Sequence, residues 1–177
     1  SQMMENWAIE PEVLATYARH YKTDEIIPQE LINKITNASK FNQGFATTEY
    51  VAASYLDMAW HMEKQEIKDA NLFEQKTLSA LGLIDQITTR YRSTYFSHIF
   101  AGGYSMGYYS YLWTEVLEAD AFVPFSEKGI FDKKTANKLK KYIYSAGNSD
   151  DLMTQYIRYR GSEPKIEALL KKRGFDE

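Results

Sequence analysis

The stretch YSMGYYSYLWTEVLEA, residues 104–119, carries the strongest helical signal in the chain and decides its fold class. At about 100° per residue in an α-helix, Tyr104, Tyr108 and Tyr111 fall within a sector of roughly 60°. We therefore predict a helix from about residue 104 to residue 119, with three phenols on one face.

Outward from this stretch, the chain shows repeated helix signals and few strand signals. The predicted helix starts carry a proline tolerated in the first turn or a residue that can cap free backbone N–H groups. They are a start near Met3 with a break at Pro11, then Pro28, Thr47, Asn71, Asp132, Ser149 and Ser162, with Gly82 and Gly174 as stops.

Three of these helices show apolar stripes at spacings of three and four residues, which indicate a buried face. The stripes are Leu14, Tyr17 and Ala18, then Leu31, Ile32 and Ile35, and then Val51, Tyr55, Met58 and Met62. No repeat or linker interrupts the series. We predict an all-α fold in which residues 1–177 form a single helical domain.

Composition excludes several classes of protein. The net charge is −3 with both signs interspersed, so the chain lacks the basic surface that nucleic-acid binding requires. No apolar run approaches the roughly 20 residues that cross a bilayer, so we expect no membrane association. The sequence has no cysteine, which excludes disulfides and thiolate metal sites.

The three histidines do not form a zinc motif. His20, His61 and His98 are far apart in the sequence, and HMEKQ at residues 61–65 lacks the second histidine of H-E-x-x-H. A helical zinc site needs that histidine because residues i and i+4 share a face. We expect this chain to hold no metal by itself.

The segment that could carry chemistry is His98 to Trp113, HIFAGGYSMGYYSYLW. The glycines at 102 and 103 permit close backbone approach and positive φ, and the turn that follows would offer free N–H groups to an anion. Phenols remain protonated near neutral pH, since their reference pKa is about 10, and could donate to a developing oxyanion. Tyrosines at helical spacing also pack in cores, and glycines before a helix often form only a turn, so this pattern alone leaves both interpretations open.

The same segment resembles the substrate-binding helix of the thimet-oligopeptidase/peptidyl-dipeptidase family. The shared features are the His-x-x-x-Gly-Gly-Tyr opening and the Gly-Tyr-Tyr-x-Tyr-Leu-Trp continuation, with the spacing of the bacterial dipeptidyl carboxypeptidase branch. Further blocks resemble the family in the same order: SQMMENW (1–7), TTEYVAA (47–53), DMAWH (57–61), EVLEADAF (115–122), RGSEP (160–164) and KRG (172–174).

The resemblance implies roles for individual residues. Tyr111 matches a tyrosine that donates a hydrogen bond to the scissile carbonyl oxygen, and Tyr104 and Tyr108 match tyrosines that bind substrate or assist it. His98 matches a histidine that contacts substrate, while Gly102 and Gly103 belong to a mobile loop over the cleft. Tyr111 and Tyr104 are thus the catalytic candidates, and the others are substrate-binding candidates.

The resemblance also implies that this chain is the C-terminal subdomain of a longer zinc metallopeptidase that hydrolyses short peptides. Zinc and its ligands would lie upstream, in the rest of the parent catalytic domain. We expect the fragment alone to be inactive and to self-associate through surfaces that the parent buries. A cytoplasmic location is expected, with a periplasmic or secreted one left open, and the alternative function is a non-catalytic helical binding or scaffold module.

Overall fold

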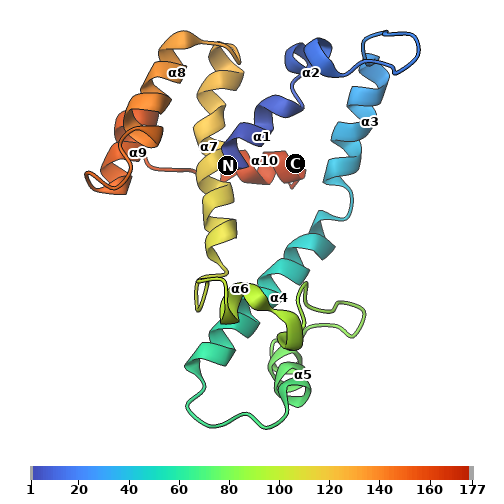
Figure 1. Ribbon diagram of the computed structural model, residues 1–177, viewed down its shortest axis with the longest axis vertical. Coiled ribbons are helices and arrows are strands. Elements are labelled where there is room, and N and C mark those ends of the chain that lie inside the picture. The colour runs from blue at the N-terminus through green and yellow to red at the C-terminus, as the bar shows by residue number, and fades with distance from the viewer. Residues whose placement is uncertain (1, 176–177) are drawn as a thin grey trace. The chain divides into compact units, whose positions relative to one another are not determined.

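The computed structural model describes residues 2–175, which form helices joined by turns and loops (Figure 1). The helices are α1 Gln2–Ala8, α2 Pro11–Tyr17, α3 Gln29–Lys40, α4 Gln43–Met62, α5 Ala70–Ala80, 3-10 helix η1 Ser93–Tyr95, α6 Ser97–Phe100, α7 Ser110–Lys128, α8 Lys133–Leu139, π-helix η2 Lys140–Tyr144, α9 Leu152–Arg160 and α10 Glu167–Arg173. In the described residues, β-structure is limited to one isolated bridge between Arg19 and Ile26. The predicted all-α class is confirmed, and no helix in this part of the chain is long and apolar enough to cross a membrane.

The described residues form two compact units, each with its own packing. We call residues 42–113 the central unit, and residues 2–41 together with 114–175 the terminal unit. Helix α7 begins in the central unit and continues in the terminal unit. Whether both belong to one domain, as expected from the sequence, stays a prediction.

The core of the terminal unit is aromatic. Trp7 of α1 packs edge-on against Phe122 and Phe125 of α7, with ring centroids 4.8 and 4.7 Å apart. Its indole Nε1 donates to the carbonyl oxygen of Ile130 at 2.8 Å, which satisfies the one polar atom that this ring buries. These contacts hold α1 on α7.

Two buried carboxylates of α7 also join helices of the terminal unit. Glu118 accepts hydrogen bonds from Asn6 of α1 and from the ammonium group of Lys172 of α10, both at 2.6 Å. Asp120 accepts from Arg160 of α9 at 3.1 Å and from the hydroxyl of Tyr156 at 2.7 Å. Each buried charge therefore has a cationic partner, which offsets its desolvation.

The central unit is built around α4. Its buried positions are mostly small, with Ala52 and Ala53 at 4% and 0% exposed, and Leu56 beside them at 0%. Phe96, Ile99 and Tyr108 complete the core with Ala53. Small side chains on α4 let the segments after α5 approach its backbone closely.

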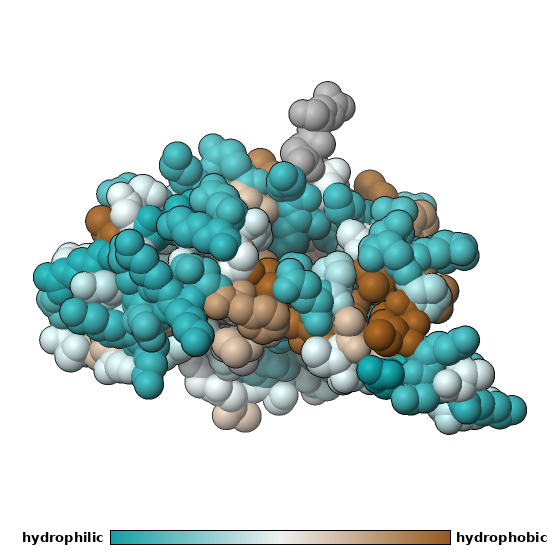
Figure 2. All heavy atoms as spheres, turned by 90° about the horizontal axis from the view of Figure 1, so that it is seen from above, coloured by the Kyte–Doolittle hydropathy of each residue, from teal (hydrophilic) through white to brown (hydrophobic). Residues whose placement is uncertain are grey.

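The predicted stripe on α4 is wrong at three of its four positions. Tyr55, Met58 and Met62 are exposed, because the side of α4 that packs within the central unit is the alanine side. On α3, Ile32 is buried while Leu31 and Ile35 are exposed. Figure 2 shows hydrophobic residues of this kind at the surface among hydrophilic ones.

Three predicted helix starts are wrong by two to five residues. Helix α4 begins at Gln43 rather than near Thr47, because Asn42 adopts the left-handed region (φ 59°) and redirects the chain there. Helix α9 is capped by Asp151, which accepts from the Thr154 amide at 2.7 Å, rather than by Ser149. Helix α10 begins at Glu167 rather than after Ser162, consistent with Pro164 disfavouring helical geometry in the residue before it.

Candidate functional site

Two glycines reverse the chain after α6. A Cβ atom on Gly102 would lie 2.9 Å from the carbonyl oxygen of His98, closer than side chains approach backbone. Gly103 has φ +80°, a conformation that costs other residues energy. The amide of Tyr104 then donates to the same His98 carbonyl at 3.1 Å, so the turn brings Tyr104 back beside His98. The predicted close approach and positive φ are confirmed.

The sequence pattern predicts a helix from about residue 104, but the residues that follow Gly103 do not form one. Helix α7 begins only at Ser110, and residues 104–109 form successive turns. Met106 has φ +55° and precedes Gly107, so the chain leaves helical geometry at this point. Of the three tyrosines expected on one helix face, only Tyr111 lies in the helix.

The amides of this segment are already bound by a carboxylate. Asp57 of α4 is fully buried, and its two carboxylate oxygens accept from the amides of Met106 at 3.0 Å and Tyr108 at 2.9 Å. His61, one turn further along α4, places Nδ1 2.9 Å from the Asp57 carboxylate. We call residues 104–109 the clamped loop.

Tyr50 binds the start of α7. Its hydroxyl donates to the carbonyl oxygen of Tyr108 and accepts from the amide of Leu112 at 3.3 Å, and its ring stacks on Tyr108 with centroids 5.2 Å apart. The expectation that this turn offers free N–H groups to an anion is therefore wrong for Met106, Tyr108 and Leu112. The side chains of α4 occupy those groups because a buried amide without a partner is costly.

The turns nevertheless bring the predicted side chains together. Tyr104 stacks on Tyr111 with centroids 5.1 Å apart, and Tyr108 meets Tyr111 edge-on at 5.4 Å. The His98 ring lies 5.7 to 6.4 Å from all three tyrosine rings. We call His98, Tyr104, Tyr108 and Tyr111 the tyrosine cluster, and Tyr91 adds a fifth ring 4.8 Å from His98.

The members of the cluster differ in access to solvent. Tyr108 is only 3% exposed and belongs to the core, whereas Tyr104, Tyr111 and His98 are partly exposed. Core packing, one of the two interpretations open from the sequence, thus describes Tyr108. The other three side chains remain accessible.

The pKa is raised for two phenols of the tyrosine cluster, Tyr111 and Tyr108. A hydrogen bond with the Tyr104 side chain, followed by burial, raises the pKa of Tyr111 to about 12. Burial raises the pKa of Tyr108 to about 12. At neutral pH these groups are hydrogen-bond donors, which suits binding of a carbonyl oxygen or of an oxyanion.

His98 carries an unsatisfied polar atom. Its Nδ1 is buried and has no hydrogen-bond partner among residues 2–175. A buried polar atom without a partner costs roughly 1–3 kcal/mol, so such atoms in native structures call for an explanation.

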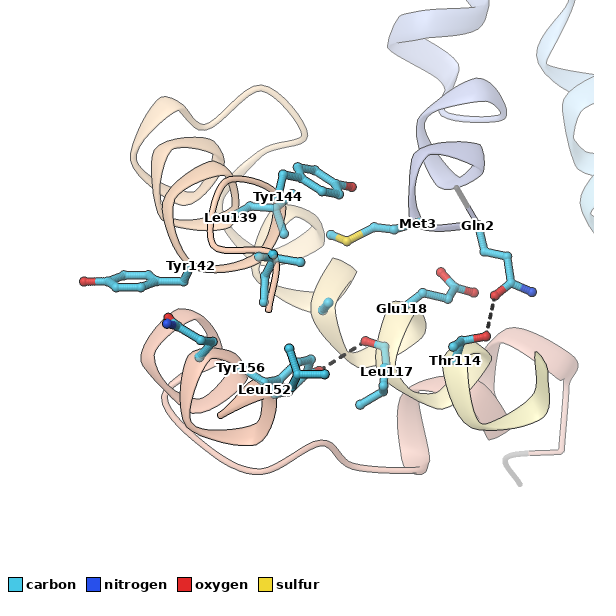
Figure 3. A pocket seen from close by; sticks show the side chains of 14 residues that line it. Gln2, Met3, Thr114, Leu117, Glu118, Leu139, Tyr142, Tyr144, Leu152 and Tyr156 are labelled. Carbon is cyan, nitrogen blue, oxygen red and sulfur yellow. Dashed lines mark hydrogen bonds between the residues drawn. The ribbon is translucent and has the colours of Figure 1, made fainter. Parts of the chain in front are cut away.

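A separate hollow of about 280 Å³ lies in the terminal unit (Figure 3). Apolar and aromatic side chains of α1, α7, α9 and η2 surround it, including Met3, Leu117, Leu152, Tyr142 and Tyr144. None of the predicted site residues lines this hollow.

Sequence reasoning missed Tyr50, Asp57 and Tyr91. Tyr50 and Asp57 are seven residues apart on α4, so they share a face, and Asp57 stands among apolar residues in LDMAW (56–60). A carboxylate in such a setting signals a buried partner. Tyr91 gives no local signal, because it lies in an irregular segment.

No metal-binding group is apparent in the described part of the chain. Within residues 2–175, no three or more His, Asp or Glu side chains come together in a way that could hold a metal ion. His61 is engaged by Asp57, and His20 accepts at Nδ1 from the amide of Thr23 at 3.2 Å.

Comparison with known proteins identifies the family. The family model described as "Peptidase family M3" matches residues 1–175, and the chain belongs to this family. It is 43% identical to dipeptidyl carboxypeptidase of Escherichia coli (strain K12) over 99% of this chain and 26% of that protein. Identity to oligopeptidase A of the same organism is 38% over 98% of this chain and 26% of the relative, and to saccharolysin of Saccharomyces cerevisiae it is 29% over 98% and 25%. The chain thus spans about a quarter of the length of these curated relatives.

Proposed function

We propose that this chain supplies substrate-binding and oxyanion-stabilising groups to a zinc-dependent peptidase that hydrolyses short peptides. Membership of peptidase family M3 supports the class of reaction. Two relatives at 43% and 42% identity are named dipeptidyl carboxypeptidase, which supports removal of C-terminal dipeptides. The name of another relative, oligopeptidase A at 38% identity, supports action on oligopeptides and leaves internal cleavage as the competing specificity.

The observation that carries the proposal is the stacked pair of Tyr104 and Tyr111 beside His98. In peptide hydrolysis the carbonyl oxygen gains negative charge as the tetrahedral intermediate forms. A phenol with a raised pKa stays protonated and donates to that oxygen, and a fixed donor stabilises the transition state more than the ground state. We assign this donation to Tyr111 and its support to Tyr104.

We propose further roles in substrate binding and in packing for the remaining predicted residues. His98 is partly exposed beside Tyr104 and Tyr111, and we propose that its accessible ring edge contacts the bound peptide. Gly102 and Gly103 let the loop approach a peptide backbone closely. Because Tyr108 is buried, we propose that it packs against Tyr111 and holds that ring in place rather than contacting substrate directly.

Zinc, which the family resemblance implies, has no set of ligands among residues 2–175. Its binding is therefore proposed for the rest of the parent catalytic domain, and the chain alone is proposed to be inactive and able to self-associate. A cytoplasmic location is proposed as well, since the relatives include a probable cytosolic oligopeptidase A from Arabidopsis thaliana at 33% identity.

The test is Tyr111→Phe in the intact parent enzyme, with Tyr109→Phe as the matched control. Removing one oxyanion donor typically lowers kcat about 10²- to 10³-fold, and we expect that loss with little change in KM. Tyr109 neighbours Tyr111 but is exposed, so its loss should leave kcat near the wild-type value. A Tyr111→Phe enzyme with wild-type kcat would exclude Tyr111 as the oxyanion donor, whereas an intact parent without any peptidase activity would favour the non-catalytic helical module.

A further inference from the structure

A buried carboxylate that the proposed reaction does not use lies directly behind the tyrosine cluster. Asp57 is 0% exposed, and its partners are two backbone amides and one histidine rather than a lysine or an arginine. Burying a carboxylate is costly unless its oxygens are fully hydrogen-bonded. The geometry of the clamped loop is therefore tied to this one side chain.

The two amides lie between the catalytic candidates in the sequence. Met106 and Tyr108 donate to different oxygens of Asp57, which fixes the peptide planes between residues 105 and 106 and between residues 107 and 108. The Gly107 amide donates to the carbonyl of Tyr104 at 2.8 Å, so the same turn also fixes Tyr104. Tyr111 lies three residues after Tyr108, and its amide donates to the Tyr108 carbonyl at 3.4 Å.

His61 orients the carboxylate. Its Nδ1 lies 2.9 Å from a carboxylate oxygen of Asp57 and 2.8 Å from the carbonyl oxygen of the same residue. Both neighbours are acceptors, so Nδ1 carries the proton and donates. The ring is 22% exposed at its side chain, which places it between Asp57 and the surface.

We propose that Asp57, oriented by His61, is a positioning residue that sets the contact between Tyr104 and Tyr111. This inference rests on the proposed function of the tyrosine cluster. Asp57 acts on the reaction through the clamped loop and does not itself touch substrate. A displacement of about 1 Å at a reacting group can cost roughly 10²-fold in rate, so the loop geometry matters to turnover.

The test is a double-mutant cycle in the intact parent enzyme. Asp57→Asn keeps the shape of the side chain but turns one acceptor into a donor that faces a backbone N–H group. We expect kcat to fall about 10- to 100-fold with KM nearly unchanged. In a Tyr111→Phe background the same change should lower kcat by less than about 3-fold, because the group that Asp57 positions is already gone.

Glu74→Gln is the matched control within the central unit. Glu74 is 3% exposed, and its carboxylate accepts from the amide of Ser93 at 2.7 Å and pairs with Arg92, so these partners are not residues of the clamped loop. Any loss of kcat in this variant should be the same in both backgrounds. Equal losses for Asp57→Asn in both backgrounds would overturn the positioning role and leave a general structural one.

Two further measurements keep the outcome decisive. His61→Phe removes the donor from a partly exposed position, and it tests the same coupling in case Asp57→Asn does not fold. Hydrogen–deuterium exchange of residues 104–109 reports on the clamp directly, and Asp57→Asn should accelerate it while leaving α5 unchanged. If Tyr111→Phe alone keeps full kcat, the proposed function fails. Unchanged exchange of residues 104–109 in Asp57→Asn would show separately that Asp57 does not hold the clamped loop.

Discussion

Asp57 of the central unit differs from the buried carboxylates of the terminal unit, whereas Glu74 of the central unit resembles them in pairing with an arginine, Arg92. In the terminal unit, Asp120 and Glu118 meet the cations Arg160 and Lys172. In the central unit, Asp57 meets backbone amides of an irregular loop and one histidine. The first arrangement joins regular helices, and the second holds a strained turn in place.

The difference separates carboxylates that join regular helices from one that supports the loop of the candidate site. An ion pair between side chains locks two helices whose own backbone bonds are complete. A carboxylate that binds amides replaces missing helical hydrogen bonds and lets the chain keep Met106 at positive φ. Such local strain concentrates at functional sites, which agrees with the tyrosine cluster lying on this loop.

The largest expected effect is on the unfolding free energy and comes from breaking an ion pair of the terminal unit. Arg160→Ala removes the cation from Asp120, which is 2% exposed, and leaves a buried charge without its main partner. Breaking such a pair typically costs about 3–5 kcal/mol in unfolding free energy. Urea unfolding of the intact parent measures it, and Lys172→Ala should cost less because its ammonium group is more exposed. A smaller loss of unfolding free energy for Arg160→Ala than for Lys172→Ala would contradict the inference that the Asp120 pair stabilises the protein more than the Glu118 pair.

The second prediction concerns the glycines of the central unit. Gly102→Ala would place Cβ 2.9 Å from the His98 carbonyl, and overpacking of this kind costs about 1–3 kcal/mol and should lower kcat as the loop shifts. Gly44→Ala is the control, since it lies in α4 with nothing within 4 Å of the added Cβ. Thermal unfolding should show Gly44→Ala stabilised by about 0.5 kcal/mol. Equal stability of the two variants would show that the close approach at Gly102 is unimportant.

The smallest predicted effect is the dependence of stability on alkaline pH. Burial, followed by the hydrogen bond to Asp120, raises the pKa of Tyr156 in the terminal unit, and the pKa of Tyr111 is raised to about 12. Both phenols ionise more easily when unfolded, so their stabilisation is complete below about pH 10 and is lost as pH rises through the folded pKa.

Unfolding free energy measured against pH checks this prediction. The loss of stability above about pH 10 should become shallower in Tyr156→Phe, and also, by a smaller amount, in Tyr111→Phe because its phenol is less buried. An unchanged alkaline slope in Tyr156→Phe would mean that this phenol is not held protonated by the fold.

Local sequence signals predicted the class of fold and most helices, because caps, prolines and apolar periodicity act over a few residues. They also grouped Tyr104, Tyr108 and Tyr111 correctly, but for the wrong reason, since helical spacing was assumed where turns occur. Asp57 escaped prediction because its partners Met106 and Tyr108 are 49 and 51 residues away, and a side chain bound to distant amides leaves no periodic pattern. The glycine pair was predictable because the constraint on Gly102 comes from His98, only four residues away.

The most direct test of the tyrosine cluster compares a peptide substrate with a phosphinic peptide that mimics the tetrahedral intermediate. If Tyr111 stabilises the transition state, Tyr111→Phe in the intact parent should weaken binding of the phosphinic peptide by the same factor by which kcat/KM falls, about 10²- to 10³-fold, while KM barely changes. A fall in kcat/KM with unchanged affinity for the phosphinic peptide would contradict a role for Tyr111 in oxyanion stabilisation.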